Sequence, residues 1–182
     1  MRWVKFGLLL FILSSVIFLV SCKKCCDRCA ILPPEVASSV DFSRYAGVWN
    51  EIAAFPNRFE VGCHCSKADY STLTYGKGSV TMSCEREGKL ESMKATFWVV
   101  DESHARLRLR FHWPFYSNSW ILYVSPDYRD ALVGTPDRDR LWVMSRSPKL
   151  NQKMLDKLTD IAKQQGYPVE NLKVTTESSC TN

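Results

Sequence analysis

The chain has 182 residues, of which 46% are hydrophobic, 12% aromatic and 24% charged, and its formal net charge is +5. These fractions argue against a disordered, collagen-like or coiled-coil protein and fit one globular domain with a short appendage. The charge excess is too small for a nucleic-acid-binding protein, and no basic patch with interleaved aromatic residues supports one. Eight cysteines are many for a protein of a reducing compartment and predict an exported protein.

Residues 1–21 have the features of an export signal. Arg2 and Lys5 precede an uncharged apolar run over residues 6–21, which is short of the roughly 20 apolar residues that a membrane-spanning helix needs. The run ends in Leu19-Val20-Ser21-Cys22, which looks like a bacterial lipobox. By this resemblance, Cys22 receives a diacylglyceryl group, the signal is cut before it and the new amine is acylated. Acyl chains of this kind would anchor the protein at a membrane, and Lys23 favours the outer one.

Residues 22–40 are expected to form the lipidated N-terminus and an extended tether. Cys25, Cys26 and Cys29 lie in this tether, and the sequence assigns no partner to them. The Cys-x-x-Cys spacings that begin at Cys22 and Cys26 are typical of zinc ligands. Because lipidation would remove Cys22 as a thiolate, a metal-binding lipoprotein is the weaker alternative, and we predict no metal site.

From residue 41 the pattern changes to short strands joined by turns. Eight strands are expected, over residues 47–55, 66–75, 79–85, 94–100, 105–111, 119–125, 130–135 and 140–146. The fifth alternates most clearly, with Leu107 and Leu109 on one face and Arg108 on the other. Eight strands in simple succession can close into an up-and-down barrel, which leaves no open edge and can hold one small ligand.

One helix follows the strands. Asn151 is a suitable N-cap residue for this helix, and Gly166 is suitable for its C-terminal end. Between them, an apolar stripe at helical spacing includes Leu155, Leu158 and Ile161. The polar face carries charges of both signs, so we expect the helix to pack on the barrel rather than on a membrane. The predicted fold class is all-β, an eight-stranded antiparallel up-and-down barrel over residues 41–182 with one C-terminal α-helix packed outside.

Three blocks of sequence agree with one known family. They are Gly47-Val48-Trp49 in the first strand, Ser125-Pro126-Asp127-Tyr128 in a later turn, and the closing strand from Leu141 to Arg146. Together they resemble the lipocalins, in particular the bacterial outer-membrane lipoprotein lipocalins of the Blc type and their relative apolipoprotein D. The resemblance spans residue 41 to about residue 175. Asn50 and Ser125 depart from it, because Tyr and Thr are usual there.

The resemblance implies a role in maintaining the fold for Gly47, Trp49 and Arg146, with Asp127 and Tyr128 in the second block. Trp49 would close one end of the barrel, and Arg146 would lie over its indole ring, a cation–π contact of about 0.5–2 kcal/mol. The resemblance also implies binding of one fatty acid or lysophospholipid, without a cofactor, for lipid storage or transport in envelope maintenance. The protein would be lipid-anchored in the outer membrane and face the periplasm, and a homodimer is allowed.

The aromatic residues of the middle strands are the candidates for the ligand cavity. Because side chains alternate along a strand, about half of them are expected to face it. The candidates are Trp98, Phe111, Trp113, Phe115, Tyr116, Trp120 and Tyr123.

The other four cysteines, Cys63, Cys65, Cys84 and Cys180, lie in the domain. The block from Cys65 to Tyr70 is similar to apolipoprotein D, and the cysteine pattern is similar to that of chloroplast-type lipocalins. These similarities imply the disulfides Cys65–Cys180 and Cys63–Cys84, and an exchange of partners between Cys63 and Cys65 stays open.

No combination of residues predicts catalysis. His64 lies between Cys63 and Cys65, and a Cys–His pair can form a thiolate nucleophile, but neighbours on a strand point to opposite faces. Phosphate-binding glycine loops and the Gly-x-Ser-x-Gly and His-Glu-x-x-His motifs do not occur. We therefore expect no enzyme activity. The alternative is a lipocalin-fold enzyme that acts on a lipid or isoprenoid.

Overall fold

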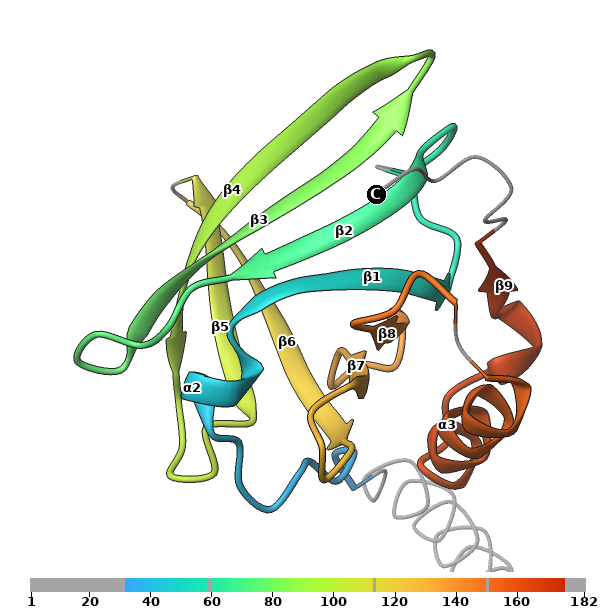
Figure 1. The fold of residues 1–182 in the computed structure, drawn as a ribbon. Helices are drawn as coiled ribbons and strands as arrows, with labels where there is room; N and C mark the ends of the chain where they lie inside the picture. The colour runs from blue at the N-terminus through green and yellow to red at the C-terminus, as the bar shows by residue number, and fades with distance from the viewer. Residues whose placement is uncertain (1–31, 59, 113, 150, 176–182) are drawn as a thin grey trace, which may run out of the picture. The chain divides into compact units, whose positions relative to one another are not determined.

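The computed structural model describes residues 32–58, 60–112, 114–149 and 151–175. The residues from Pro34 onward form one compact unit. Its elements in chain order (Figure 1) are α2 (Phe42–Tyr45), β1 (Gly47–Ala54), β2 (His64–Tyr70), β3 (Lys77–Arg86), β4 (Lys89–Val99), β5 (Arg106–His112), β6 (Phe115–Val124), β7 (Asp130–Gly134), β8 (Leu141–Ser145), α3 (Gln152–Gln164), η1 (Val169–Asn171) and β9 (Lys173–Val174).

Strands β1 to β8 close into a barrel. Each strand pairs antiparallel with its neighbours in the chain, and β1 pairs with both β2 and β8. The two residues of β9 add to the later part of β1. Closure satisfies the backbone groups that an open sheet would leave at its edges. The predicted eight-stranded up-and-down barrel is confirmed.

Two strands begin well before the residues at which the sequence predicts them to start. β4 begins at Lys89 and β6 at Phe115, several residues before the expected starts. β3 and β4 form a hairpin that projects beyond the other strands (Figure 1), with Arg86 paired to Lys89 beside its turn. In these extensions polar residues such as Glu91 and Asn118 stand beside apolar residues that are themselves exposed. Because neither face of the extensions is buried, a periodic pattern of burial does not predict them.

The α3 helix packs on the outside of the barrel, as predicted. The Asn151 side chain caps it by accepting a hydrogen bond from the Lys153 N–H, and Leu158 is buried against strand residues that include Leu132. At its far end, Tyr167 donates a hydrogen bond to the Thr135 carbonyl at 2.8 Å. In the described part of the chain, no helix has both the length and the apolar character that crossing a membrane requires.

The segment before the first strand belongs partly to the barrel. The Ala37 N–H donates to the Ile121 carbonyl, the Val40 N–H donates to the Ser103 carbonyl, and Val40 is 1% exposed. The compact unit begins at Pro34, so part of the segment that was expected to form the tether packs with the barrel. Apolar side chains at residues 36, 37 and 40 bring this segment onto the barrel.

Candidate ligand-binding interior

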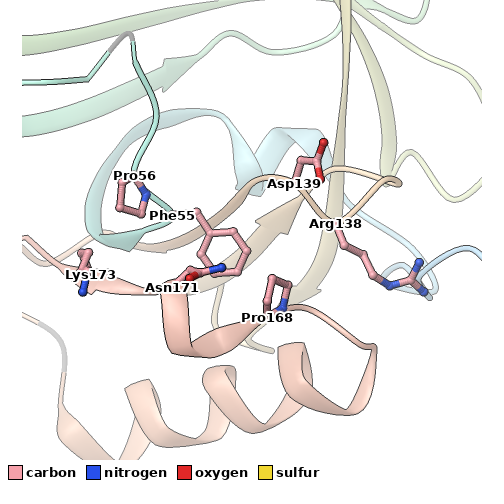
Figure 2. A pocket seen from close by; sticks show the side chains of 7 residues that line it. All are labelled: Phe55, Pro56, Arg138, Asp139, Pro168, Asn171 and Lys173. Carbon is pink, nitrogen blue, oxygen red and sulfur yellow. The ribbon is translucent and has the colours of Figure 1, made fainter.

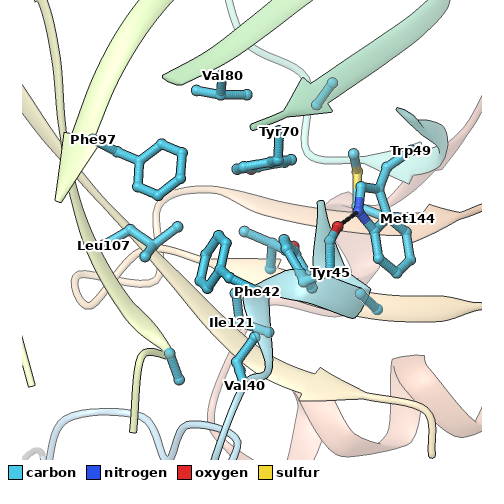
Figure 3. Close-up of a cluster of buried hydrophobic side chains, with 14 of the residues drawn as sticks. Val40, Phe42, Tyr45, Trp49, Tyr70, Val80, Phe97, Leu107, Ile121 and Met144 are labelled. Atoms are coloured by element: carbon cyan, nitrogen blue, oxygen red, sulfur yellow. Dashed lines mark hydrogen bonds between the residues drawn. The ribbon is translucent and has the colours of Figure 1, made fainter. Parts of the chain in front are cut away.

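Aromatic side chains fill one end of the barrel (Figure 3). Trp49 is fully buried and donates from Nε1 to the Tyr45 carbonyl at 2.8 Å, and the centroids of the two rings lie 4.9 Å apart. The cluster continues through the rings of Phe42, Tyr70 and Phe97, at centroid distances of 5.3 to 5.8 Å. Tilted and edge-on contacts of this kind add about 0.5–1.5 kcal/mol each beyond burial. This end of the barrel is therefore a closed plug.

Arg146 covers the outer side of this plug. Its guanidinium carbon lies 3.9 Å from the centre of the Trp49 ring, so the expected contact is present. The guanidinium also donates hydrogen bonds to carbonyls at the end of α2, which have no partners within the helix. Gly47 lies close to this group, because a Cβ at that position would be 3.4 Å from Nη1 of Arg146. The carbonyls that accept hydrogen bonds from the Arg146 guanidinium are those of Arg44, Tyr45, Ala46, Val48 and, at 3.4 Å, Tyr128.

The turn between β6 and β7 supports the same end of the barrel. The Ser125 hydroxyl donates to Asp127 at 2.6 Å and accepts from two backbone N–H groups of the turn. This hydrogen bond lowers the pKa of Asp127. The Tyr128 hydroxyl accepts from the Asp41 N–H, and Arg44 lies 4.2 Å from the Tyr128 ring centroid. Because the hydroxyl makes the Ser125 contacts, Ser can replace the usual Thr without losing them.

The inward face of the barrel becomes more accessible towards the opposite end. On β4, Ala95 is 1% exposed, whereas Met93, the next inward residue, is 47% exposed. The same change from buried to partly exposed occurs on both neighbouring strands, between Val80 and Met82 on β3 and between Leu109 and Phe111 on β5. The barrel therefore opens beside the β3–β4 hairpin, and the residues that line the opening are apolar. A surface of this kind can remove an alkyl chain from water at about 25 cal/mol per Å².

Two tyrosine hydroxyls lie in the buried part of the interior. Tyr70 interacts with Ser119 across the barrel, and burial raises the pKa of Tyr70 to about 12 against the opposing effect of that hydrogen bond. The Tyr45 hydroxyl is buried and has no hydrogen-bond partner among the residues that the structure describes. A buried hydroxyl without a partner costs about 1–3 kcal/mol.

A carboxyl group also faces the interior. Glu51 follows the inward residue Trp49 by two positions and pairs with Met144 of β8, another interior residue. By alternation, its side chain points inward. Burial and then the nearby Glu60 carboxyl raise the pKa of Glu51 to about 8. Glu51 is therefore mostly protonated at neutral pH.

Glu60 approaches this carboxyl from the segment between β1 and β2. Burial raises its pKa, while hydrogen bonds with Asn57 and Trp142 and the positive charge of Arg140 act in the opposite direction. Trp142 is an interior residue of β8. The sequence reasoning missed Glu51, although its place two residues after Trp49 in a predicted strand could have indicated its direction.

The structure separates the seven aromatic candidates. Phe111 packs against the interior cluster. Phe115 lies beside the β5–β6 turn and is 61% exposed, and Trp113 lies outside the described residues. The other four point away from the interior and are therefore not cavity residues, in a list of which only about half was expected to face the cavity; they are Trp98, Tyr116, Trp120 and Tyr123.

The contacts of these four show which face they occupy. Arg106, Arg108 and Arg110 of β5 alternate with the buried residues of that strand, and their guanidinium groups lie over the rings of Trp120, Tyr116 and Trp98 at 4.9, 4.9 and 5.9 Å. Lys157 of α3 donates to the Tyr123 hydroxyl at 2.8 Å. Aromatic content alone cannot separate the two faces of a strand, and the irregularity between Ile121 and Tyr123 changes the alternation in β6.

The Cys63–Cys84 disulfide joins the segment between β1 and β2 to β3, which confirms that predicted pair. Cys65 is disulfide-bonded as well. Because both neighbours of His64 are oxidised, neither supplies the thiol that a Cys–His nucleophile needs. In the described ranges, no three His, Cys, Asp or Glu residues group as metal ligands would. The remaining cysteines lie outside the described residues: Cys22, Cys25, Cys26, Cys29 and Cys180.

A separate pocket of about 340 Å³ lies on the helix side of the barrel (Figure 2). Phe55 and Pro168 contribute apolar surface to it, and Arg138, Asp139 and Lys173 contribute charge. Phe55 belongs to the cluster that includes Leu158 of α3, not to the interior cluster of Trp49. The pocket is therefore distinct from the barrel interior.

A closed antiparallel barrel with one plugged end, one open end and an outer helix defines a small β-barrel protein with an interior of ligand size. The sequence model of the lipocalin-like domain matches residues 40–177. The chain belongs to the lipocalin-like family.

Three relatives show how the similarity extends across kingdoms. The outer membrane lipoprotein Blc of Citrobacter freundii is 35% identical over 146 residues, which cover 77% of this chain and 82% of the relative. Temperature-induced lipocalin-1 of Arabidopsis thaliana is 30% identical, with coverage of 79% and 83%. Bovine apolipoprotein D is 27% identical, with coverage of 81% and 82%.

Solved structures share the fold at lower identity. Insecticyanin from Manduca sexta has a TM-score of 0.65 at 20% identity and matches 81% of this chain and 87% of its own. Lipocalin 12 from rat epididymis has a TM-score of 0.66 at 15% identity, with coverage of 83% and 94%.

Proposed function

We propose that the protein binds one hydrophobic small molecule, a fatty acid or lysophospholipid, inside its barrel and stores or carries it in envelope maintenance. The observation that carries this proposal is the apolar inward face, whose exposure rises from Ala95 to Met93 towards the open end. Membership of the lipocalin-like family supports it, because lipocalins bind hydrophobic small molecules. Burial of an alkyl chain against this face supplies the free energy of binding.

A pair of tryptophan substitutions tests whether the ligand lies inside the barrel. Met93 points inward at the open end, and its neighbour Lys94 points outward and is exposed. Met93→Trp should fill the interior and weaken binding of a fluorescent fatty acid by about tenfold or more, because the ligand loses buried apolar area. Lys94→Trp adds the same ring to the outer face and should leave binding unchanged. Equal affinity of the two variants would contradict the proposal.

We also propose that the protein is a lipoprotein of the outer membrane, with residues 1–21 as its signal and Cys22 as its acylated N-terminus, facing the periplasm. Relatives from Citrobacter freundii and Escherichia coli are named outer membrane lipoproteins, and the lipobox-like sequence at Cys22 supports the same location. Labelled palmitate should be incorporated into the wild-type protein and not into Cys22→Ser. Equal incorporation into both would contradict acylation at Cys22.

A further inference from the structure

We propose that Glu51 and Glu60 form an anchor inside the barrel for the ammonium group of an amphiphilic ligand. Among ligands of equal chain length, an alkyl amine or a lipid with an ammonium head group would then bind more tightly than a free fatty acid. This inference rests on the ligand-binding function proposed above and specifies the chemical class of the ligand.

Glu51 is an unusual residue for the wall of an apolar barrel. Its side chain points inward between Trp49 and Met144, and no described residue donates a hydrogen bond to its carboxyl group. Protein atoms enclose the group closely, yet the residue keeps some accessible surface, as a side chain facing an internal cavity does. A buried polar group without a partner is costly. A ligand that supplies the missing partner would remove this cost.

Glu60 brings a second carboxyl to the same place from a different element. Hydrogen bonds with Asn57 and with the Trp142 side chain hold it, so its position depends on both the β1–β2 segment and β8. Two carboxyl groups and an indole ring therefore converge at the wall of the interior. Carboxylates and aromatic faces both attract ammonium groups.

The charges around Glu51 favour a cation as its partner. Met144 and Trp142 of β8 contribute no charge, and Glu60 is the charged group that acts on Glu51. The positive charge of Arg140 acts on Glu60. A fatty acid carboxylate placed here would add a further negative charge, whereas an ammonium group would pair with Glu51 as the Glu51 proton leaves to solvent.

Three probes with one chain and different head groups test the anchor: dodecylamine, dodecanol and laurate. The wild-type full-length protein should bind dodecylamine most tightly at alkaline pH. Its affinity for dodecylamine should rise about twentyfold from about pH 6.5 to about pH 8.5, because the cation binds the ionised form of Glu51. Dodecanol should show no such rise. Calorimetry in buffers of different ionisation enthalpy should detect close to one proton released per dodecylamine bound near neutral pH.

Substitutions assign the effect to the two carboxyl groups. Glu51→Gln keeps the size of the side chain and should abolish both the proton release and the rise of dodecylamine affinity with pH. Glu60→Gln should weaken dodecylamine binding while keeping a neutral hydrogen-bonding group beside Trp142. Glu102→Gln removes an exposed carboxyl in the turn between β4 and β5. It should change neither the affinity for dodecylamine nor the proton release. A thermal melt of each variant verifies that it is folded.

The outcomes separate the anchor from the binding function. If dodecanol and laurate bind inside the barrel but dodecylamine binds no better and releases no proton, the anchor is wrong and the binding function stands. If Glu51→Gln behaves as the wild type with dodecylamine, the anchor is also wrong. If none of the three probes binds, both proposals fail.

Discussion

The guanidinium carbon of Arg146 lies 3.9 Å from the centre of the Trp49 ring, although 97 residues separate the two in the sequence. The contact joins the first strand of the barrel to the end of the last one, at the plugged end. It also fixes α2, whose terminal carbonyls accept hydrogen bonds from the same guanidinium. One side chain therefore seals the barrel and holds the helix that precedes it.

Arg146→Lys should destabilise the barrel without affecting the ligand-binding end. Lysine keeps the positive charge but cannot reach several carbonyls while stacking on an indole ring. We expect the free energy of unfolding in urea to fall by about 2–4 kcal/mol, from lost hydrogen bonds and the lost stacking contact. Arg129→Lys, in the exposed turn between β6 and β7, is the matched control and should change it by less than about 0.5 kcal/mol. Similar values for the two variants would contradict the role of Arg146.

Leu158→Ala should loosen α3 from the barrel. Leu158 is fully buried between the helix and the strands. Its truncation leaves a cavity and should lower the free energy of unfolding by about 2–5 kcal/mol. Because this cluster lies outside the barrel, the affinity for an alkyl ligand in the folded protein should be preserved. A large loss of ligand affinity in the folded variant would show that the helix shapes the interior.

The pH dependence of stability should report the buried carboxyl. In the unfolded chain the pKa of Glu51 is about 4.3, whereas burial in the folded protein raises it to about 8. Between these values the folded state binds the extra proton, so this group lowers the stability by about 1.4 kcal/mol for each unit of rising pH. In urea unfolding, the free energy of unfolding of Glu51→Gln should therefore exceed that of the wild type by an amount that is negligible near pH 4 and grows up to about pH 8. An advantage that does not vary with pH would contradict the burial of Glu51.

The Cys63–Cys84 disulfide should stabilise the open end of the barrel. It closes a loop with a sequence separation of 21 residues, and the chain-entropy model gives about 3 kcal/mol for such a loop. Replacing both cysteines by serine should lower the free energy of unfolding by about 2–4 kcal/mol. We also propose the pair Cys65–Cys180, which peptide mapping without reduction should recover. A free Cys180 in the purified protein would contradict that pair.

The sequence predicted the elements of this protein better than the directions of its side chains. The alternation of Leu107, Arg108 and Leu109 places β5 correctly, because one face is apolar and the other charged. Trp98 and Tyr116 gave no such contrast, since aromatic rings suit the interior and an arginine-covered outer face equally well. The direction of these two side chains depends on how β4 and β6 pair with β5, which the sequence alone does not give.

Glu51 and Tyr45 could not be found from composition. A glutamate in a strand is usually a solvent-facing residue. The inward direction of Glu51 is consistent with its place two residues after Trp49 and with its pairing with Met144. The Tyr45 hydroxyl is significant only because no described group pairs with it after folding. That neither group has a hydrogen-bond partner among the described residues depends on contacts between residues that are distant in the sequence, which the pattern of a single chain does not contain.

Native mass spectrometry of the mature protein, purified in mild detergent from its own membrane and followed by extraction of the bound molecule, tests the central claim most directly. We predict one hydrophobic small molecule in each folded chain of the wild type and of Lys94→Trp, and a much reduced occupancy in Met93→Trp. A wild-type protein that carries no such molecule and takes up none when one is offered, or equal occupancy in the two tryptophan variants, would contradict a ligand-binding barrel interior.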